Sequence, residues 1–440
     1  MPRPKISMNI NGSRNGALKS DLRRVFTEAV QSVEGCRCVE RYLQQHPLGG
    51  DVCVIAVGKA ACQMAAGAQR VLDEKMQEGL VITKRGYYGG SLSGFRVVEA
   101  GHPLPDQNSL QAGELLLALI ADIPVTTRLL FLVSGGTSAL VDVLPPSLTI
   151  EHLQQLNQWL LHSGLPIDKM NAIRKQVSAI KGGRLARYLE GRDTMVLIIS
   201  DVQSDDPAII GSGLLFPSGA SLSPADRQSL PAEIQRMLTL APPMPAPGDQ
   251  CFHGIHWQII ANIQQAVAAA AAAARDLGYA AEVHDEYLQG DAVETGEKVA
   301  AIMQSRPGRL HIWGGETTVT LPENPGTGGR CQTLALSAAI ALHHERHKRW
   351  ALLSAGTDGD DGNSGVAGVC ADATSIDRAC STSGVHFDPG IYLQRADAST
   401  LFTASGDLLQ TGPTGTNVTD IILGYYSDDY CNVEVKNSKI

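Results

Sequence analysis

The sequence predicts an α/β protein with two domains, each built on a parallel or mixed sheet flanked by helices. Short apolar runs of strand length alternate with longer amphipathic segments over most of the 440 residues. Glycine-rich polar loops follow several of these runs, and open α/β sheets bind ligands at such strand ends. The chain is longer than one core usually holds, and a proline-rich stretch ends at Asp249. We therefore predict domains at residues 17–250 and 251–440, with the active site in the cleft between them.

Composition argues against several classes of protein. The net charge of −9 is opposite to that of most nucleic-acid-binding proteins, so we expect no nucleic-acid partner. The nine cysteines are scattered without a CxxC pair, which indicates neither a cysteine zinc site nor a disulfide framework. No apolar run has the length of a membrane span, and the N-terminus lacks the apolar centre of a signal peptide. We expect a cytoplasmic protein without a membrane partner and leave open whether it forms a homodimer.

The first candidate site follows the first predicted strand. Apolar positions at helical spacing predict a helix over residues 21–33, and the β-branched run at residues 52–57 predicts a buried strand. That strand leads directly into Gly58-Lys59-Ala60 and a second helix. The N–H groups at a helix start and one cation together suit a phosphate group. The spacing matches neither a Walker loop nor a GxGxxG turn, and the alternative is that Lys59 is an ordinary solvated lysine.

A second polar loop follows the strand predicted at residues 128–133. Strands at 80–83 and 96–99 and a helix at 109–120 precede it, with a rigid loop around His102 that is either a ligand contact or a plain turn. A serine- and glycine-rich loop offers free backbone N–H groups and hydroxyls, which bind anions well. A plain turn is the alternative here also. The predicted ligand-binding residues of this loop are Ser134, Gly135, Gly136 and Ser138.

Two further charged features complete the first half. We predict helices at residues 149–163 and 169–189 and a strand at 194–199. Arg174 and Lys181 lie seven residues apart, so on one continuous helix they share a face and can point into a cleft. A solvated basic face is the alternative. Asp201 follows the strand and is a candidate metal-linked carboxylate.

The second half contains the segment that carries most of the predicted chemistry, residues 314–336. We predict a helix at 255–277, strands at 279–284 and 310–313, and a helix at 292–303 between those strands. Gly314 and Gly315 then form a turn that leads Glu316 into an alternating segment, and Arg330 precedes a helix at 331–344. Glycines let another molecule approach the backbone closely, so Gly315 and Glu316 are predicted ligand-binding residues. A carboxylate at a strand end and a guanidinium at a helix start are typical of phosphate and metal sites. The alternative is that the segment forms two ordinary turns whose charged side chains face the solvent.

Two more polar loops flank the last predicted strands. An acidic glycine loop containing Asp358 follows the strand at residues 350–354. It resembles the start of a calcium loop but has Val369 at the twelfth position, so we exclude an EF-hand and expect Mg²⁺ or a hydroxylated substrate. Thr416 and Asn417 lie in a tight loop before a strand at 421–423, where they offer ligand-binding groups.

Taken together, these motifs resemble the glycerate 2-kinase family, which has an N-terminal Rossmann-like domain and a C-terminal MOFRL domain. The resemblance covers residues 21–423. It implies that ATP phosphorylates D-glycerate at the 2-hydroxyl with Mg²⁺, giving 2-phosphoglycerate, and that Lys59 and Arg330 match the family's key cations. The motifs lie at residues 58–60, 101–106, 134–140, 174–186, 200–207, 314–320, 328–336, 355–362 and 412–417.

The resemblance also suggests a role for each candidate residue. Phosphoryl transfer depends mainly on positioning and charge neutralisation, so Lys59 and Arg330 are expected to stabilise the transferring group. The carboxylates of Glu316, Asp201 and Asp358 are expected to hold Mg²⁺ or orient the glycerate hydroxyls. Arg174 is expected to hold a carboxylate or phosphate.

The sequence also departs from the family pattern. Thr137 stands where the family usually has a glycine, and Cys331 stands where it usually has an asparagine, so a different 2-hydroxy acid substrate remains open. Two other functions remain as alternatives. One is an NAD(P)H-dependent hydroxypyruvate reductase, which the missing GxGxxG turn disfavours. The other is a non-catalytic metabolite-binding relative, which the retained Lys59, Glu316 and Arg330 disfavour.

Overall fold

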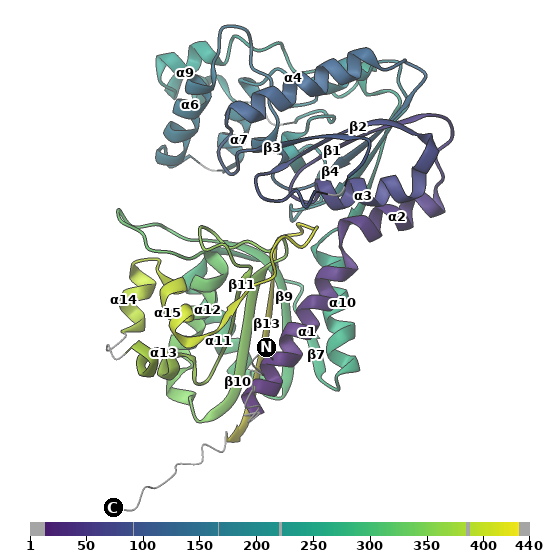
Figure 1. The fold of residues 1–440 in the computed structure, drawn as a ribbon. Helices are drawn as coiled ribbons and strands as arrows, with labels where there is room; N and C mark the ends of the chain where they lie inside the picture. Colours follow the sequence, from purple (N-terminus) through teal and green to yellow (C-terminus); the bar gives the residue numbers. More distant parts are fainter. Residues whose placement is uncertain (1–13, 91, 166, 220–221, 384–387, 431–440) are drawn as a thin grey trace, which may run out of the picture. The chain divides into compact units, whose positions relative to one another are not determined.

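The computed structural model describes residues 14–90, 92–165, 167–219, 222–383 and 388–430. Within them the chain forms two compact units, and neither unit is continuous in sequence (Figure 1). The parallel-sheet unit consists of residues 32–263 and 413–418. The mixed-sheet unit consists of described residues up to 31, 264–412 and from 419 on. These ranges differ from the predicted domains, 17–250 and 251–440, which stay a prediction, as does the placement of the active site between them.

The parallel-sheet unit is a doubly wound sheet of six parallel strands. Their order is β3-β2-β1-β4-β5-β6, so the strand order reverses between β1 and β4. The central strands β1, β4 and β5 are apolar apart from Arg128 and Thr194 at the starts of β4 and β5, because helices cover both faces of such a sheet, and every residue of β1 is buried. The strands are β1 (Val52–Val57), β2 (Met76–Lys84), β3 (Phe95–Ala100), β4 (Arg128–Val133), β5 (Thr194–Ile199) and β6 (Ile255–Ala261).

The helices of this unit form two groups. One group packs on the sheet, and its core includes Phe131, Leu116 and Leu185. The other group has a smaller core of its own, which includes Leu156, Ile173 and Ile234. The α-helices are α2 (Gly35–Gln45), α3 (Ala61–Leu72), α4 (Gln107–Asp122), α5 (Thr137–Leu140), α6 (Ile150–His162), α7 (Ile167–Gln176), α8 (Pro224–Ser229) and α9 (Ala232–Met237); short 3-10 turns are η1 (Asp73–Lys75), η2 (Arg184–Leu189), η3 (Ile210–Ser212) and η4 (Gln250–Phe252).

The mixed-sheet unit has seven strands in the order β12-β11-β10-β13-β9-β7, with β8 also paired to β9. β7 and β8 run parallel to β9, whereas the other pairs are antiparallel. Figure 1 shows α11 and α12 on one side of this sheet and α1 and α10 on the other. The strands are β7 (Ala280–Val283), β8 (Leu288–Asp291), β9 (Arg309–Thr318), β10 (Lys348–Gly356), β11 (Gly368–Asp372), β12 (Leu408–Leu409) and β13 (Asp420–Tyr430).

The core of the mixed-sheet unit is built around large side chains that are at most 1 % exposed. Trp313 on β9, Trp350 on β10 and Phe402 on α15 belong to it. Burial of such aromatic side chains contributes several kcal/mol each in the usual range of core energetics. The helices are α1 (Arg14–Ser32), α10 (Ile263–Asp276), α11 (Ala292–Ser305), α12 (Arg330–Ala341), α13 (Ser375–Ser383), α14 (Pro389–Gln394) and α15 (Ala398–Ser405), with a 3-10 turn η5 (His343–Glu345).

The predicted fold class is confirmed, because one sheet is parallel, the other is mixed, and helices flank both. Three element predictions are wrong. Residues 255–261 form strand β6 and not the start of a helix, and the helix predicted at 169–189 ends at Gln176. Gly314 and Gly315 lie inside β9 and do not form a turn. None of the described helices combines the length and the hydrophobicity that a membrane crossing requires.

Candidate active site

The first group of predicted site residues lies where β1 and β4 end side by side. Val57 pairs with Val133 in the parallel sheet, so the loops that follow both strands meet. The backbone N–H of Lys59 donates to the carbonyl of Gly135 at 2.9 Å, and that of Ala60 donates to Ser134 Oγ at 3.1 Å. The strand order reverses at this point, and doubly wound sheets bind ligands at such a position. Lys59 therefore stands beside the start of α3 at the expected ligand site.

The second loop glycine, Gly136, has a conformation that requires glycine. Its φ is +87°, and it caps the short helix α5. A Cβ there would lie 3.2 Å from Lys59 Cγ and 3.2 Å from His102 Cδ2. The Lys59 side chain and the His102 ring therefore both approach this loop. The two interpretations of His102, a ligand contact and a plain turn residue, both stay predictions.

Two further predicted residues join this group through the first loop glycine, Gly135. Asn417 Nδ2 lies 3.4 Å from Asp201 Oδ2 and donates to it. A Cβ on Gly135 would lie 1.9 Å from that Asn417 nitrogen and 2.1 Å from that Asp201 oxygen. Glycine is thus the residue that lets both polar groups approach the loop backbone. The structure brings Lys59, Gly135, Asp201 and Asn417 together, although they lie far apart in sequence.

The loop at residues 413–418 offers a buried group that is ready for a ligand. Among the described residues, Thr416 Oγ1 is buried without a hydrogen-bond partner. Such an atom is unfavourable unless water or a ligand satisfies it. The loop itself is fixed, because the Gly35 N–H at the start of α2 donates to the Gly415 carbonyl at 2.9 Å. These observations fit a cradle for a polar ligand in the parallel-sheet unit.

The two hydroxyl residues after Gly136 have structural partners. Thr137 Oγ1 is fully buried, donates to the Ser134 carbonyl at 2.7 Å and lies 3.0 Å from the Val57 carbonyl. Its hydroxyl therefore binds the backbone of its own loop, which explains how a threonine fits where the family usually has a glycine. Ser138 Oγ lies 2.7 Å from Ser212 Oγ. A role of Ser138 in ligand binding stays a prediction.

Arg174 and Lys181 do not share a helix face, contrary to the prediction. Helix α7 ends at Gln176, and two glycines with positive φ follow Lys181. The Arg174 guanidinium donates to Asn157 at 2.9 Å and to Asn171 at 3.2 Å, and burial lowers its pKa. Lys181 forms a buried ion pair with Asp142 at 2.5 Å. Lys181 is therefore structural, whereas ligand binding by Arg174 stays a prediction.

The second group of site residues lies in the mixed-sheet unit around Arg330, the first residue of α12. Its Nε and Nη2 donate to the two carboxylate oxygens of Asp420 at 2.6 and 2.9 Å. Its Nη1 lies 2.6 Å from Glu316 Oε1. Burial opposes the charge, but Asp420 and Glu316 together raise the pKa of Arg330. The guanidinium is thus held in a fixed orientation with one partner, Asp420, that is almost fully buried.

Sheet pairing explains why these groups meet. Asp420 begins β13 and pairs with Gly315 on β9 and with Gly356 on β10. Glu316 is the next residue on β9. A Cβ on Gly356 would lie 3.1 Å from Asp358 Oδ1 and 3.5 Å from Asp420 Oδ1, so Asp358 joins this group. A Cβ on Gly315 would lie 2.3 Å from the Leu288 carbonyl of β8, so packing already requires this glycine, and ligand binding by it stays a prediction.

Two family models match, a domain of unknown function (DUF4147) at residues 21–236 and the MOFRL family at residues 309–420. The D-glycerate 2-kinase of Thermotoga maritima is 35% identical over 93% of this chain and 98% of that protein. The chain belongs to the glycerate kinase family. A crystal structure of glycerate kinase from Thermotoga maritima superposes with a TM-score of 0.79 at 34% identity, over 93% of this chain and 99% of that one.

The predicted resemblance to the glycerate kinase family is therefore confirmed, and so is the prediction of an enzyme. One relative carries a different name. A protein of Agrobacterium vitis, provisionally named hydroxypyruvate reductase, is 35% identical over 91% of this chain and 92% of that protein. Family membership shows the fold and the class of enzyme.

Two carboxylates near Arg330 were not predicted from the sequence. Asp420 orients the guanidinium, and Asp361 accepts hydrogen bonds at 3.0 Å from the N–H groups of Cys331 and Gln332 at the start of α12. Burial raises the pKa of Asp361 to about 6 although these donors lower it. Asp361 lies in the acidic loop already singled out, whereas the pairing of Asp420 with Arg330 depends on strand register. Cys331 itself is buried, so its thiol packs inside the unit.

Proposed function

We propose that the protein transfers the γ-phosphoryl group of ATP to the 2-hydroxyl of D-glycerate, giving 2-phosphoglycerate, with Mg²⁺ as the metal. Membership of the glycerate kinase family implies a kinase that uses a nucleotide. The substrate and the hydroxyl follow the name of the Thermotoga maritima relative. The observation that carries the proposal is the meeting of Lys59, Gly135 and Asp201 at the reversal of the strand order.

We assign phosphate binding to the group around Lys59. The Lys59 side chain adds a cation to the N–H groups of the loop that begins at Ser134, and the unpartnered Thr416 hydroxyl adds a donor. Asp201 and Asn417 offer oxygen ligands of the kind that Mg²⁺ prefers. Mg²⁺, when bound, supplies positive charge that neutralises the phosphate oxygens.

We assign stabilisation of the transferring phosphoryl group to Arg330 together with Lys59. Asp420 holds Arg330 by two hydrogen bonds and is almost fully buried, so that pair is expected to persist. The Glu316 side chain is 43% exposed, and its ion pair with Arg330 can exchange for a phosphoryl or carboxylate oxygen of the substrate. Glu316 and Asp358 then remain available to accept hydrogen bonds from glycerate hydroxyls or to hold a second metal ion.

The deciding experiment is a coupled assay of ADP release with ATP, Mg²⁺ and D-glycerate, with the product identified by NMR. Lys59→Ala and Arg330→Ala are each expected to lower kcat/KM by at least about 100-fold, because an oriented cation at a developing charge contributes several kcal/mol. Lys75→Ala and Arg275→Ala remove exposed charges elsewhere and serve as matched controls. Turnover within a few-fold of wild type in either site variant would refute the assignment of that residue.

The reductase alternative is tested in parallel with NADH and hydroxypyruvate, because one relative carries that name. NADH oxidation without glycerate-dependent ADP release would overturn the kinase proposal. Nucleotide binding without either turnover would favour the metabolite-binding alternative. ADP release with another 2-hydroxy acid, but not with glycerate, would keep the kinase and change the substrate. Sedimentation velocity on the same sample tests whether the protein forms a homodimer.

A further inference from the structure

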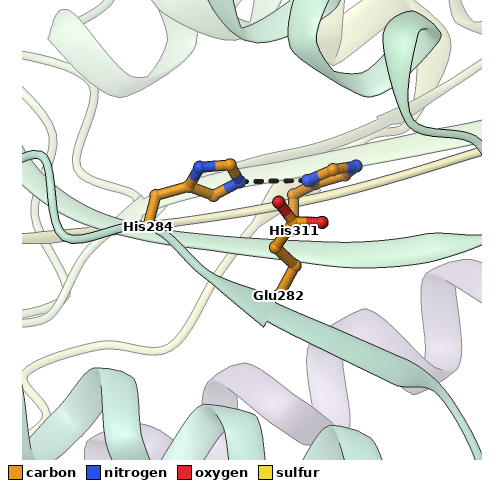
Figure 2. A group of neighbouring side chains, drawn as sticks. All are labelled: Glu282, His284 and His311. Carbon is orange, nitrogen blue, oxygen red and sulfur yellow. Dashed lines mark hydrogen bonds between the residues drawn. The ribbon is translucent and has the colours of Figure 1, made fainter.

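Three potential metal ligands gather on one face of the mixed sheet, Glu282, His284 and His311 (Figure 2). β7 and β9 run parallel, and Glu282 pairs directly with His311. His284 follows two residues after Glu282, and its N–H donates to the Ile312 carbonyl at 3.0 Å. Side chains two residues apart on an extended chain point to the same face. One ligand atom from each residue therefore falls within 4.8 Å of the others.

The two histidine nitrogens are already placed at a distance that one metal ion can bridge. His284 Nε2 lies 3.0 Å from His311 Nδ1. Zn²⁺ binds imidazole nitrogen at about 2.0–2.1 Å, so this separation corresponds to an angle of about 95° at the ion. A shift of a few tenths of an ångström reaches the tetrahedral angle. The His284 ring is also fixed, because it stacks on Trp313 with ring centres 4.3 Å apart and planes 7° apart.

The hydrogen bonds of His311 fix its tautomer. Its Nε2 lies 3.1 Å from the Arg306 carbonyl, which can only accept, so Nε2 carries the proton and Nδ1 accepts the hydrogen bond from His284 Nε2. Metal-binding histidines commonly donate their other N–H to a carbonyl in this way. On metal binding the His284 proton would move to its Nδ1, so that His284 Nε2 and His311 Nδ1 could both face the ion. Burial lowers the pKa of both histidines, which favours the neutral form that binds metals. Arg306 caps the C-terminus of α11, where the helix dipole favours a cation.

Glu282 contributes an oxygen that accepts no hydrogen bond in the described part of the chain. Its Oε1 forms an ion pair with Arg306. Its Oε2 is buried, and its ion pair with Arg309 Nε is longer, at 3.5 Å. A buried carboxylate oxygen that accepts no hydrogen bond is destabilising. A metal ion between this oxygen and the two imidazoles would satisfy it.

We propose that Glu282 Oε2, His284 Nε2 and His311 Nδ1 form a binding site for a divalent transition metal ion of the zinc class, with water as the fourth ligand. Two imidazoles and one carboxylate suit Zn²⁺ and its neighbours, whereas Mg²⁺ prefers oxygen ligands alone. The site is separate from the group around Arg330, because His311 and Glu316 are five residues apart on β9, about 16 Å. The ion would cross-link the edge strand β7 to β9 in the mixed-sheet unit.

The test uses the full chain after removal of metals with a chelator. Titration with Co²⁺ is expected to give one ion per chain and the visible absorption bands of a four-coordinate site. Isothermal titration with Zn²⁺ is expected to give the same stoichiometry. His284→Gln can still donate a hydrogen bond to His311 but lacks the imidazole, so it separates metal binding from the hydrogen bond. It is expected to weaken Zn²⁺ binding by at least about 100-fold, and Glu282→Gln by about 10-fold or more.

His256→Ala, which removes an exposed histidine of the other unit, is the matched control and is expected to leave affinity unchanged. Zn²⁺ should also raise the melting temperature of wild type and not that of His284→Gln. Absence of saturable one-to-one binding to wild type would overturn the proposal. Equal Zn²⁺ affinity in His284→Gln and His256→Ala would overturn it as well. Because the readouts are metal binding and stability, the result is independent of the kinase assay.

Discussion

The substitution Gly135→Ala adds one methyl group at the point where Lys59, Asp201 and Asn417 meet. Gly135 does not have a positive φ, so the backbone accepts alanine and the effect comes from the side chain alone. The new Cβ would lie 1.9 Å from Asn417 Nδ2 and 2.1 Å from Asp201 Oδ2, where ordinary contact begins near 3.4 Å. Both polar groups must therefore move by more than 1 Å, which separates Asp201 from its position beside the loop.

A displacement of about 1 Å in a group that positions reactants can cost about 100-fold in rate. That loss corresponds to about 2.7 kcal/mol of transition-state stabilisation. Crowding at a packed site costs about 1–3 kcal/mol of folding free energy, and here the crowded atoms are side-chain ends that can shift, which favours the lower figure. We therefore expect kcat/KM for ADP release to fall about 100-fold while the protein remains folded.

The assay is ADP release under varied glycerate, with the melting temperature and urea unfolding measured on the same sample. Gly248→Ala is the matched control, because a Cβ there meets no atom within 4 Å and the residue has no positive φ. It should retain wild-type kinetics. A value of kcat/KM for Gly135→Ala within three-fold of wild type would show that the approach of Asp201 and Asn417 to this loop is not needed for turnover.

Three other perturbations test the electrostatics of the two units. Asp420→Asn removes the buried charge that orients Arg330, so the free energy of urea unfolding of the mixed-sheet unit should fall by about 2 kcal/mol. The rate of ADP release should fall as well, and an unchanged kcat/KM would contradict this positioning role. Lys181→Met leaves the Asp142 carboxylate buried without its cation, so unfolding free energy should fall by about 3–5 kcal/mol, and a loss below 1 kcal/mol would count against a buried pair. Burial raises the pKa of Asp361 to about 6, so the folded protein keeps this carboxyl protonated at pH values where the unfolded chain has already lost the proton. The free energy of unfolding therefore falls as pH rises from about 4 through 6. Urea unfolding across that range should show wild type losing up to about 3 kcal/mol relative to Asp361→Asn, whereas parallel pH profiles would refute the shift.

Strands β1, β4 and β5 of the parallel sheet were predicted with their correct bounds, because each is an apolar run with at most one polar residue at its start. The runs at Val52–Val57 and Arg128–Val133 are examples. β6 was missed because it is an edge strand with exposed residues, including Trp257, and it continues directly into an alanine-rich helix. The long helix was predicted from periodicity that extends past Gln176, although the glycines after Lys181 interrupt it.

Candidate site residues in loops after strands could be proposed from the sequence, because each such loop is recognisable from its local composition. Lys59 and Gly135 are of this kind. Contacts between residues that meet only through strand pairing could not be predicted from the sequence. The Asp420 carboxylate meets Arg330 only because β13 pairs with β9 and β10, and the Glu282 and His311 side chains meet only because β7 pairs with β9 in one register. Nothing in the local sequence fixes those registers.

The loop at residues 413–418 belongs to the parallel-sheet unit although 149 residues of the mixed-sheet unit, 264–412, precede it in the chain. During translation the residues of all six parallel strands are therefore synthesised long before Thr416 and Asn417. At roughly 5–20 residues per second, the interval is on the order of 10–30 s. Over that time a nascent chain holds Lys59 and Asp201 without the loop that completes their surroundings. If the phosphate site proposed above lies here, ligand binding at it has to wait until residues 413–418 have been synthesised.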